Sequence, residues 1–178
     1  MLETERLILR QWKESDKLPF IDMGIDPEVM RYLPKCLTKE ESLKLIDKVS
    51  RIIDKNKWGI WAVELKDNNE FIGFIGIHNQ PELFDFSPCV EIAWRLAKQH
   101  LGNGYATEGA KATLEYAFKT LKLNKVIAVT ATINKPSQSI MEKLGMTRVK
   151  EFNHPEFSIA PELEKHILYE ILNPSSKS

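Results

Sequence analysis

The sequence has no excess charge of either sign and very little cysteine. Its 178 residues include 25 Lys or Arg and 25 Asp or Glu, so the formal net charge is zero. Broad nucleic-acid-binding and membrane-binding surfaces need excess positive charge, so we expect neither kind of partner. Cys36 and Cys89 lie far apart and form no C-x-x-C pair. We expect both to be free thiols buried as small apolar side chains, as is usual in a reducing compartment.

Long hydrophobic runs are also missing. No apolar stretch approaches the length of a membrane-spanning helix, and the acidic, then strand-like start does not resemble a signal peptide. The expected location is therefore cytoplasmic. The four histidines show no zinc-like spacing with each other or with cysteine, so we expect no metal site.

What the sequence does contain is the balance of one ordinary globular domain. Hydrophobic residues make up 43% and charged residues 28%, and the length fits a single core. We expect one domain over residues 1–172 and a flexible polar tail over residues 173–178.

Hydrophobic periodicity predicts strands and helices in a mixed order. Strands are expected at residues 4–12, 58–65, 70–78, 89–96, 125–132, 149–152 and 166–172. Helices are expected from Ser15 towards Gly24, after the capping box Thr38-x-x-Glu41, over residues 104–121, and from Pro136 to a C-cap at Gly145. The order β-α-α-β-β-β-α-β-α-β-β is typical of an α+β fold rather than a regular βαβ series.

The most informative segment is a glycine-bearing turn between a strand and a helix. Gly102 and Gly104 follow the strand at residues 89–96 and precede the helix at residues 104–121. Without side chains there, backbone N–H groups can point into a shared concavity, and the helix N-terminus adds free N–H groups and partial positive charge. Such an arrangement suits a pyrophosphate, although a tight structural turn remains an alternative.

Two other phosphate-binding motifs do not fit this segment. A P-loop requires G-x-x-x-x-G-K-[ST], and the sequence contains no such run. The dinucleotide fingerprint G-x-G-x-x-G/A is broken by Thr107, and no acidic residue follows the strand at residues 125–132.

The spacing Gln99-x-x-Gly102-x-Gly104 resembles the pyrophosphate signature [QR]-x-x-G-x-[GA] of the GNAT superfamily of N-acetyltransferases. The segment "NKPSQSIMEKLGM", which begins at Asn134, is similar to the passage from a strand into the next helix in that family. The opening "ETERLILRQWKESD" resembles the RimJ/RimL-type branch, which includes ribosomal-protein N-terminal acetyltransferases. The resemblance covers residues 2–172, and separate segments agree in order and spacing.

The resemblance implies a GNAT fold, which is α+β with a central mixed, mostly antiparallel sheet flanked by helices. Its parallel strands at residues 91–96 and 125–132 would splay apart around the co-substrate acetyl-CoA. The implied reaction is direct transfer of the acetyl group to a primary amine, either a protein N-terminus or a small molecule. Monomers and homodimers both occur in similar proteins. A module that binds acyl-CoA without turnover, as a sensor or scaffold, is the alternative.

The resemblance also implies which residues bind the co-substrate. Backbone groups on one strand would bind the pantetheine arm and polarise the thioester carbonyl, namely those of Ala93, Trp94, Arg95 and Leu96. Main-chain N–H groups in the turn would hold the pyrophosphate, namely those of Gln99, His100, Leu101, Gly102, Asn103, Gly104, Tyr105 and Ala106. Asn134 would hydrogen-bond the pantetheine from the end of the second strand.

Glu91 and Ser137 are the candidates for proton transfer. An amine must be neutral to attack, so a base is useful, and related enzymes often place a carboxylate on the strand of Glu91. Many relatives use a tyrosine as general acid, but the aligned residue here is Met141, which cannot donate a proton. Ser137, one helical turn earlier, could protonate the leaving thiolate, or could serve only to start the helix. His154 could contact the acceptor or be structural.

Overall fold

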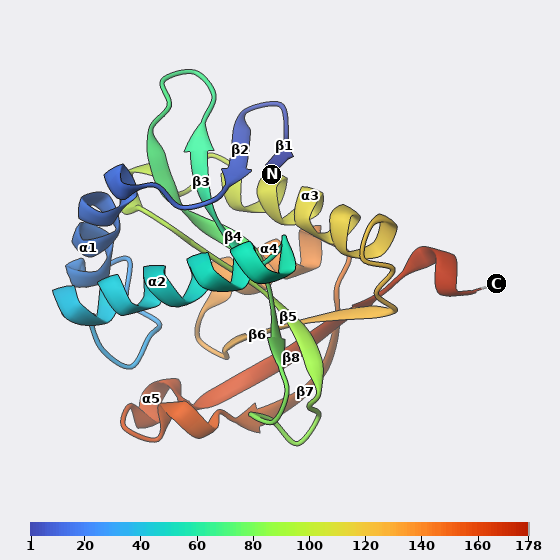
Figure 1. The fold of residues 1–178 in the computed structure, drawn as a ribbon. Coiled ribbons are helices and arrows are strands. Elements are labelled where there is room, and N and C mark those ends of the chain that lie inside the picture. The colour runs from blue at the N-terminus through green and yellow to red at the C-terminus, as the bar shows by residue number, and fades with distance from the viewer. Residues whose placement is uncertain (178) are drawn as a thin grey trace.

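The computed structural model describes residues 1–177, and a single sheet with helices on both faces organises this part of the chain (Figure 1). Its eight strands have the order β1-β2-β3-β4-β5-β6-β8-β7. Their bounds are β1 (Leu2–Glu3), β2 (Leu7–Arg10), β3 (Ile60–Leu65), β4 (Phe71–Gln80), β5 (Cys89–Leu96), β6 (Lys125–Ala131), β7 (Thr147–Asn153) and β8 (Lys165–Leu172). Neighbouring strands are antiparallel except β5 and β6, which are parallel. The predicted α+β fold is confirmed.

Five α-helices accompany the sheet in the described residues. They are α1 (Lys17–Ile25), α2 (Lys39–Asn56), α3 (Tyr105–Lys119), α4 (Lys135–Lys143) and the short α5 (Pro161–Glu164). Phe20 of α1 and Ile46 of α2 pack with Phe74 of β4 on one face. Leu114 of α3 and Met141 of α4 belong to the main core on the other face. In Figure 1, α2 crosses the foreground of the sheet.

Local signals set several helix ends as the sequence predicts. Thr38 Oγ1 accepts a hydrogen bond from the Glu41 N–H at 3.1 Å, and Glu41 Oε2 accepts one from the Thr38 N–H at 2.8 Å. This reciprocal pair is the predicted capping box at the start of α2. Gly145 follows α4 with φ at 78°, in the left-handed region, and its N–H donates to the Glu142 carbonyl at 3.0 Å.

Two local predictions are wrong, and one helix was not predicted. The strand expected at residues 4–12 is only β2 (Leu7–Arg10), because the Thr4 N–H donates to the Leu7 carbonyl at 3.0 Å and closes a tight turn that leads from β1 into β2. Helix α5 was not expected, since four residues are too few to show helical periodicity. Cys36 is exposed and Cys89 only half-buried, although both are free thiols.

The end of the described chain packs back on the domain. Asn173, the first residue of the expected tail, is 7% exposed. Its Nδ2 donates to the Leu123 carbonyl at 2.9 Å. None of the described helices is both long and apolar enough to cross a membrane.

Candidate active site

Strands β5 and β6 share very little of their length. The structure records one parallel register pair between them, Glu91 with Ile127. Beyond that pair β5 continues against β4, and β6 continues against β8, each to its end. The edge of β5 that carries Ala93 to Leu96 therefore lacks a ladder partner on the β6 side. Unpaired strand edges offer N–H and C=O groups to an extended ligand, as the predicted pantetheine contacts require.

The turn from β5 into α3 presents a row of unused donors. Within residues 1–177, no hydrogen bond to the N–H groups of residues 102–107 is recorded. Gly102 and Gly104 have φ of 77° and 79°, a region that favours glycine, and a Cβ at Gly102 would meet nothing within 4 Å. Gly104 is also the N-cap of α3 and supplies no capping side chain. The turn thus has the donors and the open space that a pyrophosphate needs.

Two of the predicted pyrophosphate donors are already used inside the turn. The His100 N–H donates to the Ala97 carbonyl at 3.0 Å, and the Leu101 N–H donates to the Lys98 carbonyl at 3.2 Å. Gln99, between them and the strand, is exposed. These residues shape the turn, and the row of free donors begins at Gly102.

Arg6 lies over the same turn, although no motif pointed to it. Its Nη1 donates to the Asn103 carbonyl at 3.0 Å, and its guanidinium carbon stands 4.5 Å from the centre of the Tyr105 ring. Its Nη2 lies 2.7 Å from Oε2 of Glu108 on α3, and Thr4 Oγ1 donates to Glu108 Oε1 at 2.5 Å. Burial opposes ionisation of Glu108, but these hydrogen bonds hold its pKa below the ordinary value. Arg6 therefore fastens the start of the chain to this turn, and the carboxylate of Glu108 balances its charge.

Glu91 is a buried carboxylate at the point where β5 and β6 part. The residue is 9% exposed, and its Oε2 accepts a hydrogen bond from Gln80 Nε2 at 3.0 Å. Burial raises the pKa of Glu91 to about 7, the hydrogen bond from Gln80 opposes this rise, and the negative charge of Glu156 adds to it. A carboxylate with this pKa exchanges its proton readily near neutral pH, as a general base must.

His78 is a second member of this cluster that the sequence alone did not identify. It pairs with Glu91 across β4 and β5, and its Nε2 lies 3.4 Å from Glu91 Oε2. Burial lowers the pKa of His78 to about 4, and the positive charge of Lys48 lowers it further, so the ring is neutral at pH 7. One signal was available: His78 and Gln80 are polar residues two apart at the end of an apolar strand, and so share a face.

Asn134 and Ser137 contact each other at the start of α4. The Ser137 N–H donates to Asn134 Oδ1 at 3.2 Å, and Asn134 Nδ2 donates to Ser137 Oγ at 3.2 Å. Asn134 is therefore the N-cap of this helix. Because Ser137 Oγ accepts in this pair, its own hydroxyl hydrogen stays free to donate elsewhere. Met141, one turn later, is 2% exposed and belongs to the core.

His154 is enclosed by aromatic rings rather than placed among the groups around Glu91. Its ring centre lies 4.5 Å from that of Phe157, 4.6 Å from that of His166 and 5.2 Å from that of Phe84. Its Nδ1 accepts from the Glu156 N–H at 3.2 Å. Burial, and secondarily His166, lower the pKa of His154 to about 4. His154 thus positions the segment whose Glu156 acts on Glu91.

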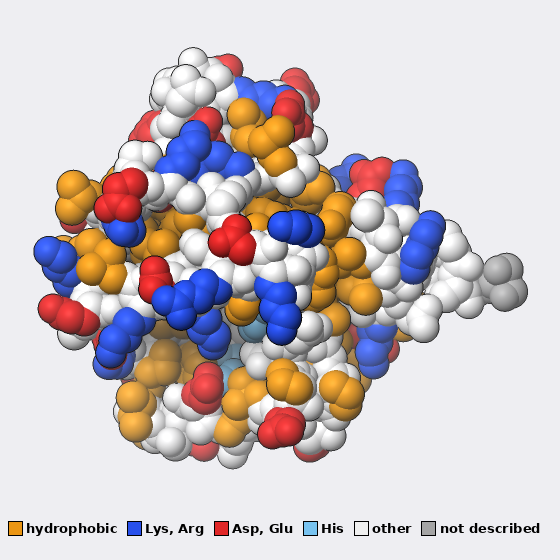
Figure 2. All heavy atoms as spheres, viewed as in Figure 1, with side chains coloured by type: hydrophobic (Ala, Val, Ile, Leu, Met, Phe, Trp, Pro, Cys, Tyr) orange, Lys and Arg blue, Asp and Glu red, His pale blue; other side chains and the backbone are white. Residues whose placement is uncertain are grey.

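The surface between α2 and the C-terminal strands is hollowed. Figure 2 shows histidine atoms at the bottom of a hollow between α2 and the C-terminal strands, with Lys and Arg side chains along the α2 rim. A cavity of about 370 Å³ lies at the β4–β5 connection, lined by Leu83, Phe84, Asp85, Phe152, Asn153 and Pro155.

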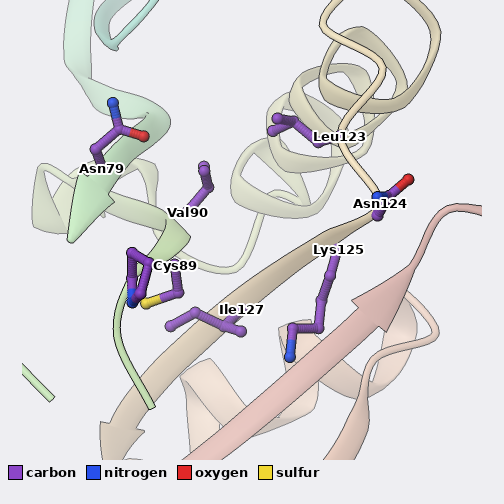
Figure 3. Close-up of a pocket in the computed structure, with 8 residues that line it drawn as sticks. Asn79, Cys89, Val90, Leu123, Asn124, Lys125 and Ile127 are labelled. Carbon is purple, nitrogen blue, oxygen red and sulfur yellow. The ribbon is translucent and has the colours of Figure 1, made fainter. Parts of the chain in front are cut away.

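A second cavity, of about 300 Å³, lies where β5 and β6 begin, and Cys89, Lys125 and Ile127 are among the residues around it (Figure 3). Ile127 is also the partner of Glu91 in the parallel pair. This cavity therefore lies where the two strands are still together. Among the residues that the structure describes, no group of three or more His, Cys, Asp or Glu side chains could hold a metal ion.

Comparisons with known proteins agree with this geometry. The acetyltransferase (GNAT) domain family matches residues 6–147. The chain is 31% identical to the N-acetyltransferase YnaD of Bacillus subtilis, itself uncharacterized, over 83% of this chain and 82% of YnaD. A GNAT-family acetyltransferase structure from Bacillus anthracis is 29% identical, with a TM-score of 0.81 and coverage of 97% of this chain and 98% of that one.

Spermidine N-acetyltransferase from Vibrio cholerae, solved with CoA and spermine, has a TM-score of 0.75 at 22% identity and covers 96% of this chain and 97% of that one. That identity is low enough that the likeness shows the fold alone. The family match and the relatives in Bacillus show more: the chain belongs to the GNAT family and is an acetyltransferase.

Proposed function

We propose that this enzyme transfers the acetyl group of acetyl-CoA to a primary amine by direct attack of the amine on the thioester. The observation that carries the proposal is the position of Glu91. A buried carboxylate with a pKa of about 7 stands at the point where β5 loses its partner strand. A proton acceptor for the amine and an open backbone edge for the donor therefore meet at one place.

The donor fits the groups available along β5 and the turn. Backbone groups from Ala93 to Leu96 would bind the pantetheine arm, and an N–H near Ala93 or Trp94 would polarise the thioester carbonyl. The free N–H groups from Gly102 to Ala106 would hold the pyrophosphate, and Arg6 would fix the turn through the Asn103 carbonyl. Asn134 would reach the pantetheine from the end of β6.

Glu91 would take a proton from the substrate ammonium group, so that the neutral amine can attack the thioester carbonyl and form the new C–N bond. Its raised pKa lets it accept a proton near neutral pH and release the proton to solvent afterwards. As the C–S bond breaks, the thiolate would take a proton from Ser137, whose hydroxyl hydrogen is not used in its contact with Asn134. Ser137 would regain a proton through solvent, and the amide nitrogen would give up its remaining extra proton by the same route. His78 and Gln80 would hold Glu91 in place.

One observation favours a second function. Met141, which replaces the tyrosine that many relatives use as general acid, is 2% exposed and cannot donate a proton. A module that binds acyl-CoA without turnover is therefore the alternative. The buried, high-pKa carboxylate at Glu91 supports the enzyme instead, because a simple binding module has no use for a base at that position.

The acceptor proposed is the primary amine of a protein N-terminus or of a small molecule, in line with the RimJ/RimL-type branch. The amine-acetylating relative from Vibrio cholerae shares the fold. We further propose a cytoplasmic protein that acts as a monomer or homodimer, with residues 1–172 forming the catalytic domain.

The proposal is tested by measuring the binding of acetyl-CoA and the acetylation of amines in parallel. A thermal-shift comparison of acetyl-CoA, coenzyme A, NAD and ATP should give a shift for the first two only. A ligand at about 100 times its dissociation constant adds roughly 2.7 kcal/mol, which for a domain of this size raises Tm by roughly 5–10 °C. A larger shift with NAD, or none with acetyl-CoA, would rule out the proposed donor.

The variant Glu91→Gln separates the two functions. An enzyme should keep its acetyl-CoA affinity and lose roughly 10²–10⁴-fold in kcat/KM for an amine, because the general base is gone. Glu115→Gln is the matched control, since Glu115 is an exposed carboxylate on α3 that pairs with Lys119. A binding module would bind acetyl-CoA but show no turnover of any amine in the parent protein.

A further inference from the structure

Two arginines with buried guanidinium nitrogens lie on the sheet face that α1 and α2 cover. Only one of them forms ion pairs with carboxylates. Arg10 contacts two carboxylates: its Nη1 lies 2.7 Å from Asp16 Oδ2, and its Nε lies 2.7 Å from Glu64 Oε2. Both acids are buried as well. This is the usual arrangement for a charge inside a protein, because an unpaired buried charge is costly.

Arg95 on β5 has no such partner. Its Nη1 is fully buried without a hydrogen-bond acceptor, and no ion pair to Arg95 is recorded anywhere in residues 1–177. The guanidinium stands over the ring of Phe74, 5.1 Å from its centre. Burial lowers the pKa of Arg95 to about 10, and no carboxylate of the described chain acts against this. The group is therefore a cation at neutral pH that the protein itself leaves unneutralised.

Other acids of the described chain have partners of their own. Asp26 and Glu28, which follow α1, lie 4.0 Å and 3.5 Å from Lys98 Nζ. On β5 itself, Glu91 accepts a hydrogen bond from Gln80 of the neighbouring strand β4. Among the described residues Arg95 has no acceptor for Nη1. Planar carboxylates match the guanidinium fork best, so a carboxylate ligand would complete it.

Arg95 shares its sheet face with the proposed base. Glu91, Ala93 and Arg95 alternate along β5, so their side chains point to the same side. With a rise of about 3.3 Å per residue, Glu91 and Arg95 are roughly 13 Å apart at Cα. That face is covered by α1 and α2, whereas the phosphate-binding turn opens at the start of α3 and already has its own donors in residues 102–106.

We propose that Arg95 binds the carboxylate of the acceptor, so that the preferred substrates are amines that also carry a carboxylate at some distance from the reacting nitrogen. The amine would lie at Glu91 and the carboxylate at Arg95, with the acetyl group presented between them along β5. This inference rests on the proposed acetyl transfer, and it makes Arg95 a substrate-binding residue that determines specificity.

Paired probes test the inference directly. The probes are β-alanine, γ-aminobutyrate and ε-aminocaproate, each compared with its carboxamide. Binding of each probe is measured with coenzyme A present, and turnover is measured with acetyl-CoA. The parent protein should prefer the carboxylate of at least one pair by about 10-fold or more, as expected for a charge-assisted pair. Arg95→Gln should abolish that preference and leave the KM for acetyl-CoA unchanged. Arg51→Gln, at an exposed ion pair on α2, is the control that should change nothing.

Stability without any ligand gives an independent readout. Arg95→Met keeps the volume and removes an unpaired buried cation, so its Tm should equal or exceed that of the parent protein. Replacing an arginine that forms buried ion pairs should instead lower the Tm, and Arg10→Met is the variant that provides this comparison.

Three results would overturn the inference: no carboxylate preference in any pair, a rise in the KM for acetyl-CoA alone, or an Arg95→Met protein that melts several degrees lower. Failure of the proposed function would look different. In that case acetyl-CoA would not bind the parent protein, whereas the ligand-free Tm comparison would still report on Arg95.

Discussion

The side-chain amide of Gln80 on β4 donates a 3.0 Å hydrogen bond to Oε2 of Glu91 on β5. Because the acceptor is the ionised carboxylate, this bond favours the charged form, whereas burial favours the neutral form. Burial prevails and raises the pKa of Glu91 to about 7. The proposed base is thus balanced between two opposing influences, and each can be changed by mutation.

Replacing Gln80 by Leu should raise the pKa of Glu91 further. A base works only when deprotonated, so the acid limb of the pH profile of kcat/KM, expected near pH 7, should move to higher pH. Activity at neutral pH should fall and should recover in alkaline buffer. Glu91→Gln should lack this limb, and adding Gln80→Leu to it should cause no further shift. An unmoved limb in Gln80→Leu would mean that another group titrates.

Replacing Gly104 by Val should block the phosphate site. The side chain would stand beside the free N–H groups, and a φ of 79° disfavours any β-branched residue. We expect a folded protein whose affinity for acetyl-CoA, measured by calorimetry, drops at least about 10-fold, because charge-assisted hydrogen bonds are lost.

Gly145→Val is the matched control for that variant. Gly145 has a φ of 78°, so the backbone penalty is similar, but the residue caps α4 and a Cβ there meets nothing within 4 Å. It should lower stability and leave the affinity for acetyl-CoA unchanged. Equal loss of affinity in both variants would show that strain, rather than access to the turn, is responsible.

Replacing Arg10 by Met should destabilise the fold strongly. Asp16 and Glu64, 1% and 5% exposed, would remain as buried carboxylates, and Lys13 would be left as the recorded cation beside Glu64. Breaking a buried pair of this kind typically costs about 3–5 kcal/mol. Urea unfolding measures the loss, and Arg51→Met on the surface should stay within about 0.5 kcal/mol of the parent protein.

Acid should weaken the aromatic cluster around His154. Burial lowers the pKa of this histidine to about 4 in the folded protein, whereas an unfolded histidine titrates near about 6.5. Between these values the unfolded state binds more protons, so the free energy of unfolding falls as the pH falls from about 6.5 to about 4. His154→Phe removes this contribution and should flatten the decline measured by urea unfolding at several pH values. An unchanged slope would contradict the assigned pKa.

Much of the fold follows from local sequence. The Thr38 capping box, Gly145 after α4, and the glycines before α3 each act within a few residues, so their chemistry is visible in the sequence. The boundaries that failed depend on competition between neighbours. Thr4 could continue a strand or close a turn with Leu7, and alternation of apolar residues does not distinguish the two.

The site is less visible because its contacts are distant in sequence. Arg6 and Glu108 are 102 residues apart, and nothing near Arg6 shows that it will lie on the turn of Asn103. His78 and Glu91 meet only through the register of β4 and β5. The missing partner of Arg95 is visible only once every carboxylate has been placed.

The hydrogen bonds that join the hairpin of β1 and β2 to the turn before α3 have an energetic consequence. Thr4 and Arg6 hold Glu108, and Arg6 also holds the Asn103 carbonyl, so ordering one segment orders the other. Linkage is reciprocal, so a donor molecule that rigidifies the turn must also slow hydrogen exchange at the amides of β1 and β2. At the proposed donor site the first ten residues would thus contribute to donor affinity without contacting the thioester, and we expect a fusion tag that disturbs them to weaken binding at the far end of β5.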